Sequence, residues 1–506
     1  MESKKVDYIL ILDVGTSSMR GILFDEKGNS LFTKQIPYVA RHISAVKIEQ
    51  PAADWDDACE KILSEVADVL QQKNWMLAAI AITSQRSSLL PVDENGEALM
   101  PAIMWQDSRN SQICQRLQES NAEIFQKSGA PVNTVFSGGK MAWIRQKAPE
   151  IYARTKHFLS VPEYILHRLT GEYRTDTTFA SRSNLMNIRS KTWDDELCRI
   201  FGVPQEMLCE ILEPGTVQGG LCQTMAARTG IAEGTPVISA GGDQQCAAIG
   251  QGVCRPGVLS ITAGTGAFLM TALKEVPQHM ENGLICNCSS VTGQYVLEAS
   301  SMTCCSAFDW FLRNFYQHEK DVYGKVGQVL QTLYGQTENC IALPYFQGRQ
   351  ADDLEDTVRA AFVNLSLATN RENMLKGLLE SICMEIADQM EKLQQYVKID
   401  AIGISGGLTN NRNINQLQAD VYQKRIYHLK NSESTASGAW MVAAAGLGWY
   451  TSVQDAFDAS GLMETAQFYN PNTELAETYR KKRTAMHELY GAVRRWGALQ
   501  KQEVEQ

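Results

Sequence analysis

The chain has 506 residues, more than one hydrophobic core normally serves, so at least two domains are expected. Its 44% hydrophobic and 21% charged residues are ordinary for a globular protein, and no apolar run approaches the roughly 20 residues of a membrane-spanning helix. The net charge of −10 argues against a nucleic-acid partner, because a phosphate backbone requires a basic stripe.

The thirteen cysteines predict neither a disulfide framework nor a zinc site, since they are scattered and lack zinc-ligand spacing. Residues 1–7 are mostly charged or polar and lack the apolar core of a signal peptide. We therefore expect reduced thiols that serve as small hydrophobes, a cytoplasmic location and no membrane partner.

The first hundred residues read as strand, hairpin, strand, helix and strand. Apolar runs at 8–12 and 22–24 predict two strands, and apolar residues at helical spacing from 59 to 70 predict a helix with Asp54 as its N-cap. Residues 80–83 predict a further buried strand. Strands mixed with amphipathic helices indicate an α/β architecture.

Residues 130–240 read as largely helical, and then the opening pattern returns: a strand over 258–262 runs into a second Gly-Thr turn. An apolar stripe predicts a long helix over 375–393, a strand follows at 399–404, and a charged surface helix is expected after about 467. Since each half holds one Gly-Thr hairpin, we expect a distant duplication, with domains at 1–250 and 251–506.

The pentad Asp13-Val14-Gly15-Thr16-Ser17 places a carboxylate at the end of the first strand. The glycine lets the chain reverse where backbone N–H groups can face an anion, and Arg20 follows closely. This arrangement suits a metal-bound polyphosphate. An ordinary hairpin is the alternative, because Asp and Gly are common in turns.

Four loops share this design of a strand that ends in a small or acidic polar cluster. They lie at 13–17, 241–245, 264–266 and 405–407. In an open α/β sheet such strand ends converge on a crevice where ligands bind. No segment matches a P-loop, and no G-x-G-x-x-G follows a strand with the acidic residue of a Rossmann dinucleotide site.

Several motifs in series resemble the FGGY carbohydrate kinases of the actin-like ATPase superfamily, from about residue 7 to 450. Besides the two Gly-Thr hairpins, the motifs are Trp105-Gln106-Asp107-Ser108-Arg109, Phe136 to Trp143, Asp243-Gln244-Gln245, Gly406 to Asn411 and Glu433 to Ala439. The resemblance implies two α/β domains of the actin-like (ribonuclease H-like) fold with a cleft between them. It also implies phosphorylation of a small sugar or polyol with ATP and Mg²⁺, in a homodimer or homotetramer.

The resemblance assigns the catalytic base to Asp243, for which a helix N-cap is the structural alternative. Asp13 matches the carboxylate that binds magnesium through water, with Asp243 also near the metal. Two further groups are implied to bind the nucleotide. The phosphate group comprises Gly15, Thr16, Ser17, Arg20, Gly264 and Thr265, and the nucleoside group comprises Cys305, Asp309, Gly406, Gly407 and Asn411.

The implied substrate pocket departs from that of glycerol kinases at two positions. Ser87 stands where their Gln-Arg-Glu motif has glutamate, and Val135 stands in place of a tyrosine. These losses predict a roomier pocket that is less suited to glycerol. Xylulose kinases have Met-His at Arg86-Ser87, which this chain also lacks. The other implied contacts are Arg86, Trp105, Asp107, Asp243, Gln244 and Phe268, of which Trp105 and Phe268 could equally be core aromatics.

The sequence thus predicts an ATP-dependent kinase for a small polyol or ketose, with a pentulose or glycerol as narrower alternatives. A catalytically inactive sugar or nucleotide sensor is the alternative of another class, and Asp243 argues against it because a sensor has no need of a base. A chaperone-like ATPase would lack residues 105–109 and would need a peptide-binding domain, for which no segment remains.

Overall fold

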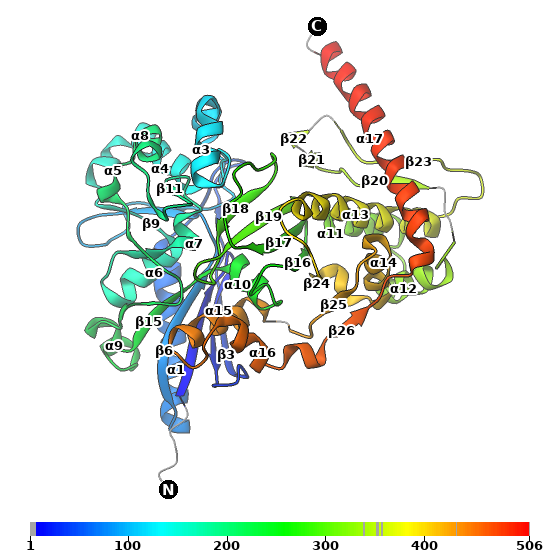
Figure 1. Ribbon diagram of the computed structural model, residues 1–506. Coiled ribbons are helices and arrows are strands. Elements are labelled where there is room, and N and C mark those ends of the chain that lie inside the picture. The colour runs from blue at the N-terminus through cyan, green and yellow to red at the C-terminus, as the bar shows by residue number, and fades with distance from the viewer. Residues whose placement is uncertain (1–6, 337–339, 351–353, 356–357, 432, 505–506) are drawn as a thin grey trace.

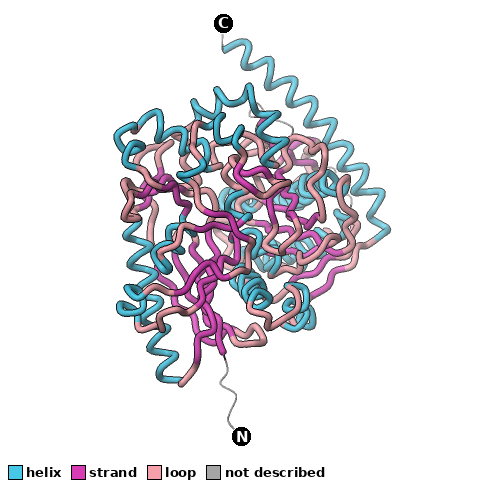
Figure 2. Tube along the Cα trace, turned by 60° about the vertical axis from the view of Figure 1, so that its left-hand side comes forward, coloured by secondary structure: helices cyan, strands magenta, loops and turns pink. Residues whose placement is uncertain are grey.

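The computed structural model describes residues 7–336, 340–350, 354–355, 358–431 and 433–504. Two halves lie side by side, each built around a mixed β-sheet with helices packed against it (Figure 1, Figure 2). The α/β fold class predicted from the sequence is confirmed.

The N-terminal half centres on a six-stranded sheet of order β14-β15-β6-β1-β2-β3. Its strands are almost wholly apolar where they pass through the core, and β1 is buried from its second residue onward. Their bounds are β1 Asp7–Val14, β2 Ser18–Phe24, β3 Ser30–Pro37, β6 Met76–Ser84, β14 Val217–Gly220 and β15 Pro236–Gly242.

The C-terminal half centres on a seven-stranded sheet of order β18-β19-β17-β16-β24-β25-β26. Its strands are β16 Val258–Ala263, β17 Ala267–Leu273, β18 Ile285–Cys288, β19 Tyr295–Ser301, β24 Ala401–Gly406, β25 Ile426–His428 and β26 Gln467–Tyr469.

The two sheets repeat one topology. In each, a hairpin (β1-β2 or β16-β17) continues into an antiparallel third strand, and two parallel strands lie on its other side. An antiparallel strand closes that second edge in both sheets. This repetition supports the duplication that the two Gly-Thr hairpins predict.

A smaller sheet of order β4-β5-β8-β7-β9 extends the N-terminal half. Its strands are β4 Arg41–His42, β5 Ile48–Gln50, β7 Leu89–Val92, β8 Ala102–Ile103 and β9 His157–Ser160. The sequence predicts a largely helical region over 130–240, but the structure also contains strands there, such as β9. The helices of this region are α4 Ser137–Lys147, α5 Pro149–Arg154, α6 Val161–Thr170, α7 Thr177–Ala180, α8 Asp195–Phe201 and α9 Gln223–Thr229.

The helix predicted after Asp54 is α1 (Ala52–Lys73), but the prediction of its N-cap was wrong. Pro51 is the N-cap, and Asp54 lies inside the first turn. Proline, whose ring fixes φ, suits a helix start, and an acidic side chain in the first turn interacts favourably with the helix dipole. Helices α2 (Ser111–Leu117) and α3 (Asn121–Ser128) follow in the same half.

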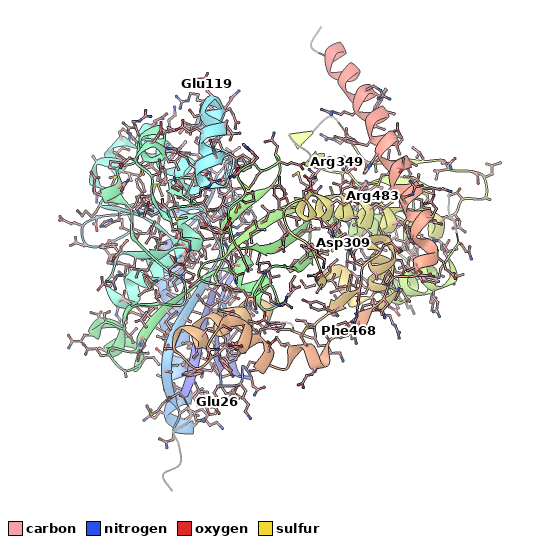
Figure 3. The ribbon with its side chains drawn as sticks, in the orientation of Figure 1. Glu26, Glu119, Asp309, Arg349, Phe468 and Arg483 are labelled. Atoms are coloured by element: carbon pink, nitrogen blue, oxygen red, sulfur yellow. The ribbon has the colours of Figure 1, made fainter. Side chains whose placement is uncertain are left out.

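The predicted apolar stripe forms the core side of α13 (Arg371–Gln394). The charged tail forms α17 (Ala476–Val504), which packs beside α13 and then extends away from the body (Figure 1). Arg349 and Arg483, labelled in Figure 3, both bind Asp388 of α13. The remaining helices are α10 Asp243–Ile249, α11 Cys305–Phe315, α12 Val322–Thr332, α14 Arg412–Tyr422, α15 Ser434–Gly446 and α16 Val453–Ala459.

Helices α10 and α15 cross closely where the two halves meet. A Cβ atom at Gly438 would lie 1.8 Å from the Cys246 carbonyl oxygen, so the crossing requires glycine. Although α15 follows residue 251, Trp440 and its neighbours pack with Ile9 and Ile11 of β1 in one apolar cluster. The C-terminal half thus completes the core beneath the N-terminal sheet.

Eleven of the thirteen cysteines are buried, as expected for small hydrophobes. Within the described residues, no helix is both long enough and apolar enough to cross a membrane.

Candidate active site

Three strands of the N-terminal sheet end at one edge. In the parallel register Val14 and Gly242 both pair with Ser84, so Gly15, Gln85 and Asp243 all follow at that edge. Gly241 has a φ of 100°, and a Cβ there would lie 2.1 Å from the Ser290 hydroxyl. The glycine therefore permits the turn that presents Asp243.

Asp243 begins helix α10, and Gly242, not Asp243, is the N-cap. The Asp243 Oδ1 accepts a hydrogen bond of 2.7 Å from the Gln244 backbone N–H, and the Arg86 Nε lies 3.8 Å away. Burial, together with the nearby charge of Asp13, raises the pKa of Asp243 to about 6, while Arg86 opposes the rise. A carboxylate with such a pKa is mostly ionised at neutral pH and is suited to accept a proton.

Arg86 joins the two halves through a buried ion pair. Its Nη1 donates to Glu298 Oε1 of β19 at 2.7 Å and to Gln245 Oε1 at 3.2 Å. Glu298 also accepts from the Asn287 amide at 2.7 Å, and these partners lower the pKa of its carboxyl. The arginine and glutamate side chains are only 11% and 12% exposed.

Arg182 is a second buried arginine in the same place. It lies in the turn after α7, and its backbone carbonyl accepts a hydrogen bond from the backbone N–H of Ser137 at the start of α4. Its guanidinium stacks on Phe136, 4.5 Å from the ring centre, and its Nη1 is 3.7 Å from Glu298 Oε2. Burial and the charge of Arg86 lower the pKa of Arg182 to about 9.

A cavity of about 330 Å³ lies above these groups, between the two halves. Seven of the residues predicted to contact substrate or nucleotide line it: Thr16, Arg86, Trp105, Val135, Asp243, Gln244 and Phe268. Trp105 and Phe268 are 37% and 49% exposed, so they are not core aromatics. Sequence reasoning missed Arg182 and Glu298, which also line the cavity.

Ser87 and Asp107, which the sequence predicts to contact substrate, do not line this cavity. Ser87 has a φ of 70°, a left-handed turn that places its side chain in a separate small cavity beside Ser137. Asp107 is fully buried, where it accepts hydrogen bonds from the Ile48 N–H at 2.6 Å and from Arg109. The hydrogen bonds of the Asp107 carboxylate thus link its own segment to β5 at Ile48.

The Asp13 carboxylate forms an ion pair with Arg20, whose Nη1 also donates to Glu433 Oε2 at 2.5 Å. Burial raises the pKa of Asp13. The resemblance implies that Arg20 faces the phosphates. In the structure its guanidinium forms ion pairs with one carboxylate from each half. Gly15 and Thr16 are half-buried and Ser17 is exposed at the tip of the same hairpin.

The Gly264-Thr265-Gly266 turn of the C-terminal half is held by helix α11. The Cys305 and Cys304 backbone N–H groups donate to the carbonyls of Gly264 and Thr265, each at 2.9 Å. The Thr265 side chain remains exposed. Because Ala263 pairs with Gly406 in the parallel register, this turn lies next to the Gly406-Gly407 turn.

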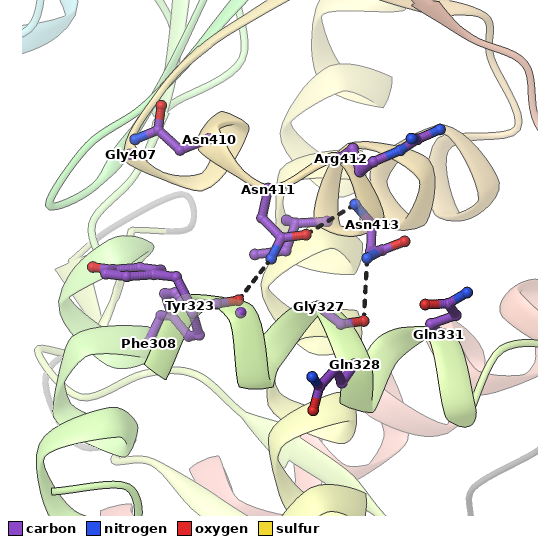
Figure 4. Close-up of a pocket in the computed structure, with 12 residues that line it drawn as sticks. Phe308, Tyr323, Gly327, Gln328, Gln331, Gly407, Asn410, Asn411, Arg412 and Asn413 are labelled. Carbon is purple, nitrogen blue, oxygen red and sulfur yellow. Dashed lines mark hydrogen bonds between the residues drawn. The ribbon is translucent and has the colours of Figure 1, made fainter. Parts of the chain in front are cut away.

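A second cavity, of about 430 Å³, lies beside the Gly406-Gly407 turn (Figure 4). Asn411 caps α14, and its amide donates to the Tyr323 carbonyl at 3.1 Å, while Asn413 reaches the Gly327 carbonyl. The lining residues are Phe308, Tyr323, Gly324, Gly327, Gln328, Gln331, Gly407, Asn410, Asn411, Arg412, Asn413 and Ile414. Both Gly407 and Asn411, predicted beside the nucleoside, are among them.

Three residues assigned to the nucleoside do not line the second cavity. Gly406 lies at the strand end behind Gly407, with a φ of 92°. Cys305 donates its thiol to the Ala263 carbonyl, and Asp309 is exposed on α11 (Figure 3), where Phe308 instead faces the cavity.

Among the described residues no three His, Cys, Asp or Glu side chains form a metal-binding group. Asp13 and Asp243 are close enough that the charge of one raises the pKa of the other. Two carboxylates fit Mg²⁺, which keeps several waters and is usually held by one or two carboxylates and substrate phosphates.

Family models match the chain in both halves. The N-terminal domain of the FGGY family of carbohydrate kinases matches residues 8–250, and the C-terminal domain of that family matches residues 259–447. The chain belongs to the FGGY family of carbohydrate kinases. It is an ATP-dependent phosphotransferase that acts on a small sugar or polyol.

Similar proteins include kinases for different substrates. A glycerol kinase of Thermococcus gammatolerans is 28% identical over 481 residues, which are 94% of this chain and 95% of that protein. A xylulose kinase of Bacillus subtilis is 25% identical, with 94% of each covered. The structure of Plasmodium falciparum glycerol kinase with ADP matches with a TM-score of 0.88 and 25% identity, over 97% of this chain and 98% of that one. The fold is therefore that of the actin-like kinases.

Proposed function

We propose that this FGGY kinase transfers the γ-phosphoryl group of Mg·ATP to a hydroxyl of a small polyol or ketose that binds in the 330 Å³ cavity. The observation that carries this proposal is the position of Asp243. A carboxylate with a pKa of about 6 lines a cavity between the two halves, together with Thr16 of the first glycine-threonine turn and Phe268 of the strand that follows the second.

Asp243 accepts the proton of the attacking hydroxyl. As the substrate O–H bond breaks, its oxygen forms a bond to the γ-phosphorus, and the bond from that phosphorus to the β-γ bridging oxygen breaks to release ADP. Burial keeps Asp243 basic enough for this step, and Arg86 keeps it ionised at neutral pH.

The nucleotide would occupy the second cavity with its base and ribose and cross the Gly264–Gly266 turn with its phosphates. This turn lies between the two cavities, since its neighbour Gly407 lines one and Phe268 of the following strand lines the other. Thr16 and Thr265 offer hydroxyls from opposite halves, so residues 1–250 and 251–506 would act as two lobes.

Mg²⁺, when bound, neutralises charge on the β- and γ-phosphates. Asp13 and Asp243 would hold it through water. Burial raises the pKa of the Asp13 carboxyl even though Arg20 is its ion-pair partner, so a further cation held through water would stabilise its charged form, and the two residues fit this metal.

Between the narrower substrates, the geometry favours a pentulose over glycerol. Val135 offers no hydrogen bond, and Ser87 is turned away from the cavity, so the chain supplies fewer groups for a triol than the glycerol kinase motif implies. A non-catalytic sensor of the same fold is disfavoured because it would have no use for a correctly placed base.

The test is Asp243→Asn, with Asp195→Asn as matched control because Asp195 also begins a short helix, α8. ADP release across glycerol, erythritol, xylulose and ribulose should fall by about 10²-fold or more in Asp243→Asn, while ATP still binds. Near-normal turnover would remove Asp243 from this role. A wild-type chain that binds these compounds without turnover would favour the sensor, and a preference for glycerol would refute the reading of the pocket.

A further inference from the structure

Arg182 holds hydrogen-bond donors that the described part of the chain leaves unused. Its side chain is 8% exposed and lines the substrate cavity. The Nε and Nη1 atoms are buried, and neither has a hydrogen-bond partner. The nearest carboxylate oxygen, Glu298 Oε2, is 3.7 Å from Nη1, too far for a hydrogen bond.

Neither Glu298 nor Phe136, which lie beside Arg182, accepts a hydrogen bond from these two nitrogen atoms. Glu298 Oε1 accepts from Arg86 and Asn287, and the ring of Phe136 holds the guanidinium plane without accepting a strong hydrogen bond. A buried N–H without an acceptor destabilises the protein, and more so when the group is charged. Because a guanidinium only donates, a molecule in the cavity satisfies it by presenting an acceptor.

We propose that Arg182 determines substrate specificity by donating to an acceptor-only oxygen of the substrate, the carbonyl of an open-chain ketose or the carboxylate of an aldonate. This inference rests on the proposed function, since it concerns the same cavity. It narrows the substrate class: the compound carries a C=O or carboxylate group in addition to the hydroxyl that is phosphorylated.

The size of the cavity agrees with a chain longer than glycerol. A water molecule takes about 30 Å³ in the liquid, and on that generous scale per carbon or oxygen atom glycerol needs about 180 Å³ and a five-carbon ketose about 300 Å³. The cavity holds about 330 Å³. A five-carbon compound therefore fits in the cavity, and glycerol would leave room in it.

An alditol of the same length is the informative comparison. Its hydroxyl must turn its own proton away in order to accept from Arg182, whereas a carbonyl or carboxylate oxygen has no proton to turn. A site built around a hydrogen bond rejects analogues that cannot make it by up to about 10⁴-fold. For a hydroxyl that makes the bond less well, we expect a smaller factor of about 10²-fold.

The experiment measures kcat/KM by ADP release for one matched set: ribulose, ribonate, ribitol and glycerol. The wild type should prefer ribulose or ribonate over ribitol by about 10²-fold, and the better of the two identifies carbonyl or carboxylate. In Arg182→Met, which keeps the apolar contact with Phe136, this preference should collapse to within about threefold. Arg199→Met, an exposed arginine on α8, is the matched control and should retain the preference.

Arg182→Lys keeps the charge but loses the planar fork, so its preference should fall at least about tenfold. It also serves if Arg182→Met fails to fold. Binding without ATP, followed through intrinsic tryptophan fluorescence, to which Trp105 in the cavity contributes, should show the same ranking in the wild type and lose it in both variants, which a purely structural role would not produce.

Two results would overturn the inference. One is a wild type that prefers ribitol or glycerol. The other is an Arg182→Met enzyme in which all four compounds lose the same factor, because Arg182 would then act on a step common to all of them. Failure of the proposed function is distinguishable: none of the compounds would release ADP from the wild type, or Asp243→Asn would turn over normally.

Discussion

The pH dependence of kcat/KM depends on the protonation of Asp243. With a pKa of about 6, this carboxylate is about nine-tenths ionised at pH 7 and about one-tenth ionised at pH 5, so kcat/KM should fall roughly tenfold between them. An ordinary aspartate, with a pKa of about 3.9, would remain more than about nine-tenths ionised at pH 5 and give a flat profile.

Two neighbouring charges should move this acidic limb in opposite directions. Arg86 lowers the pKa of Asp243, so Arg86→Met should raise that pKa and move the limb to higher pH. The charge of Asp13 raises the pKa of Asp243, so Asp13→Asn should move the limb to lower pH. Both variants are expected to be slow because both residues contact the site, but the position of the limb is independent of the plateau rate.

The assay follows ADP release with sugar and Mg·ATP both well below their KM values, from pH 4.5 to 8.5 at constant ionic strength, since the rate then reports the pKa of the free enzyme. Arg199→Met serves as the control, because its guanidinium is exposed and does not line the cavity. A limb near pH 4 in the wild type would refute the reasoning. So would a shift of Arg86→Met and Asp13→Asn in the same direction, and loss of the limb in Asp13→Asn would assign it to Asp13.

Three further predictions concern stability and nucleotide binding. The folded-state pKa of Asp243 is raised from 3.8 to about 6, so its stabilising contribution is lost as pH rises through 6. Asp243→Asn should therefore raise the free energy of unfolding, measured by urea denaturation, by about 3 kcal/mol at pH 8 and by less at pH 5. Glu298→Ala, which leaves Arg86 buried without its partner, should cost about 3–5 kcal/mol in the same assay, whereas Glu433→Ala should cost about 1 kcal/mol or less because its pair is more exposed; equal losses would contradict this. Gly407→Val should raise KM for ATP at least about tenfold by filling the second cavity, with KM for the sugar unchanged, and the reverse pattern would place the nucleotide elsewhere.

Much of the fold and the cleft could be predicted because local patterns encode them. Strand ends carry their own signals: the apolar run of β1 stops at Asp13, and that of β15 stops at Gly242. Parallel strands bring their carboxyl ends to one edge of a sheet, so residues that follow different strands can be predicted to lie close together. The placement of Thr16, Asp243 and Phe268 around one cavity follows from this rule.

Backbone conformation and long-range pairing could not be read in the same way. Ser87 follows a strand end as Gln85 and Arg86 do, but its left-handed φ turns the side chain into a different cavity, and nothing in a serine announces this. Asp107 looks like a ligand group in a polar motif, yet it is satisfied by Arg109 two residues away. A polar residue near a site can hold the site together without touching what binds there.

Glu298 and Arg182 show why the specificity of the pocket escaped the sequence. Glu298 lies inside strand β19, where alternation alone would predict a core or surface position, and it meets Arg86 from 212 residues away in the chain. That pairing occupies Glu298 and leaves Arg182, which stacks on Phe136, with unused donors. These donors lack partners because the two lobes bring Glu298 to Arg86. The need for an acceptor on the substrate can therefore be inferred only from the hydrogen-bond partners of each buried charge in the folded protein.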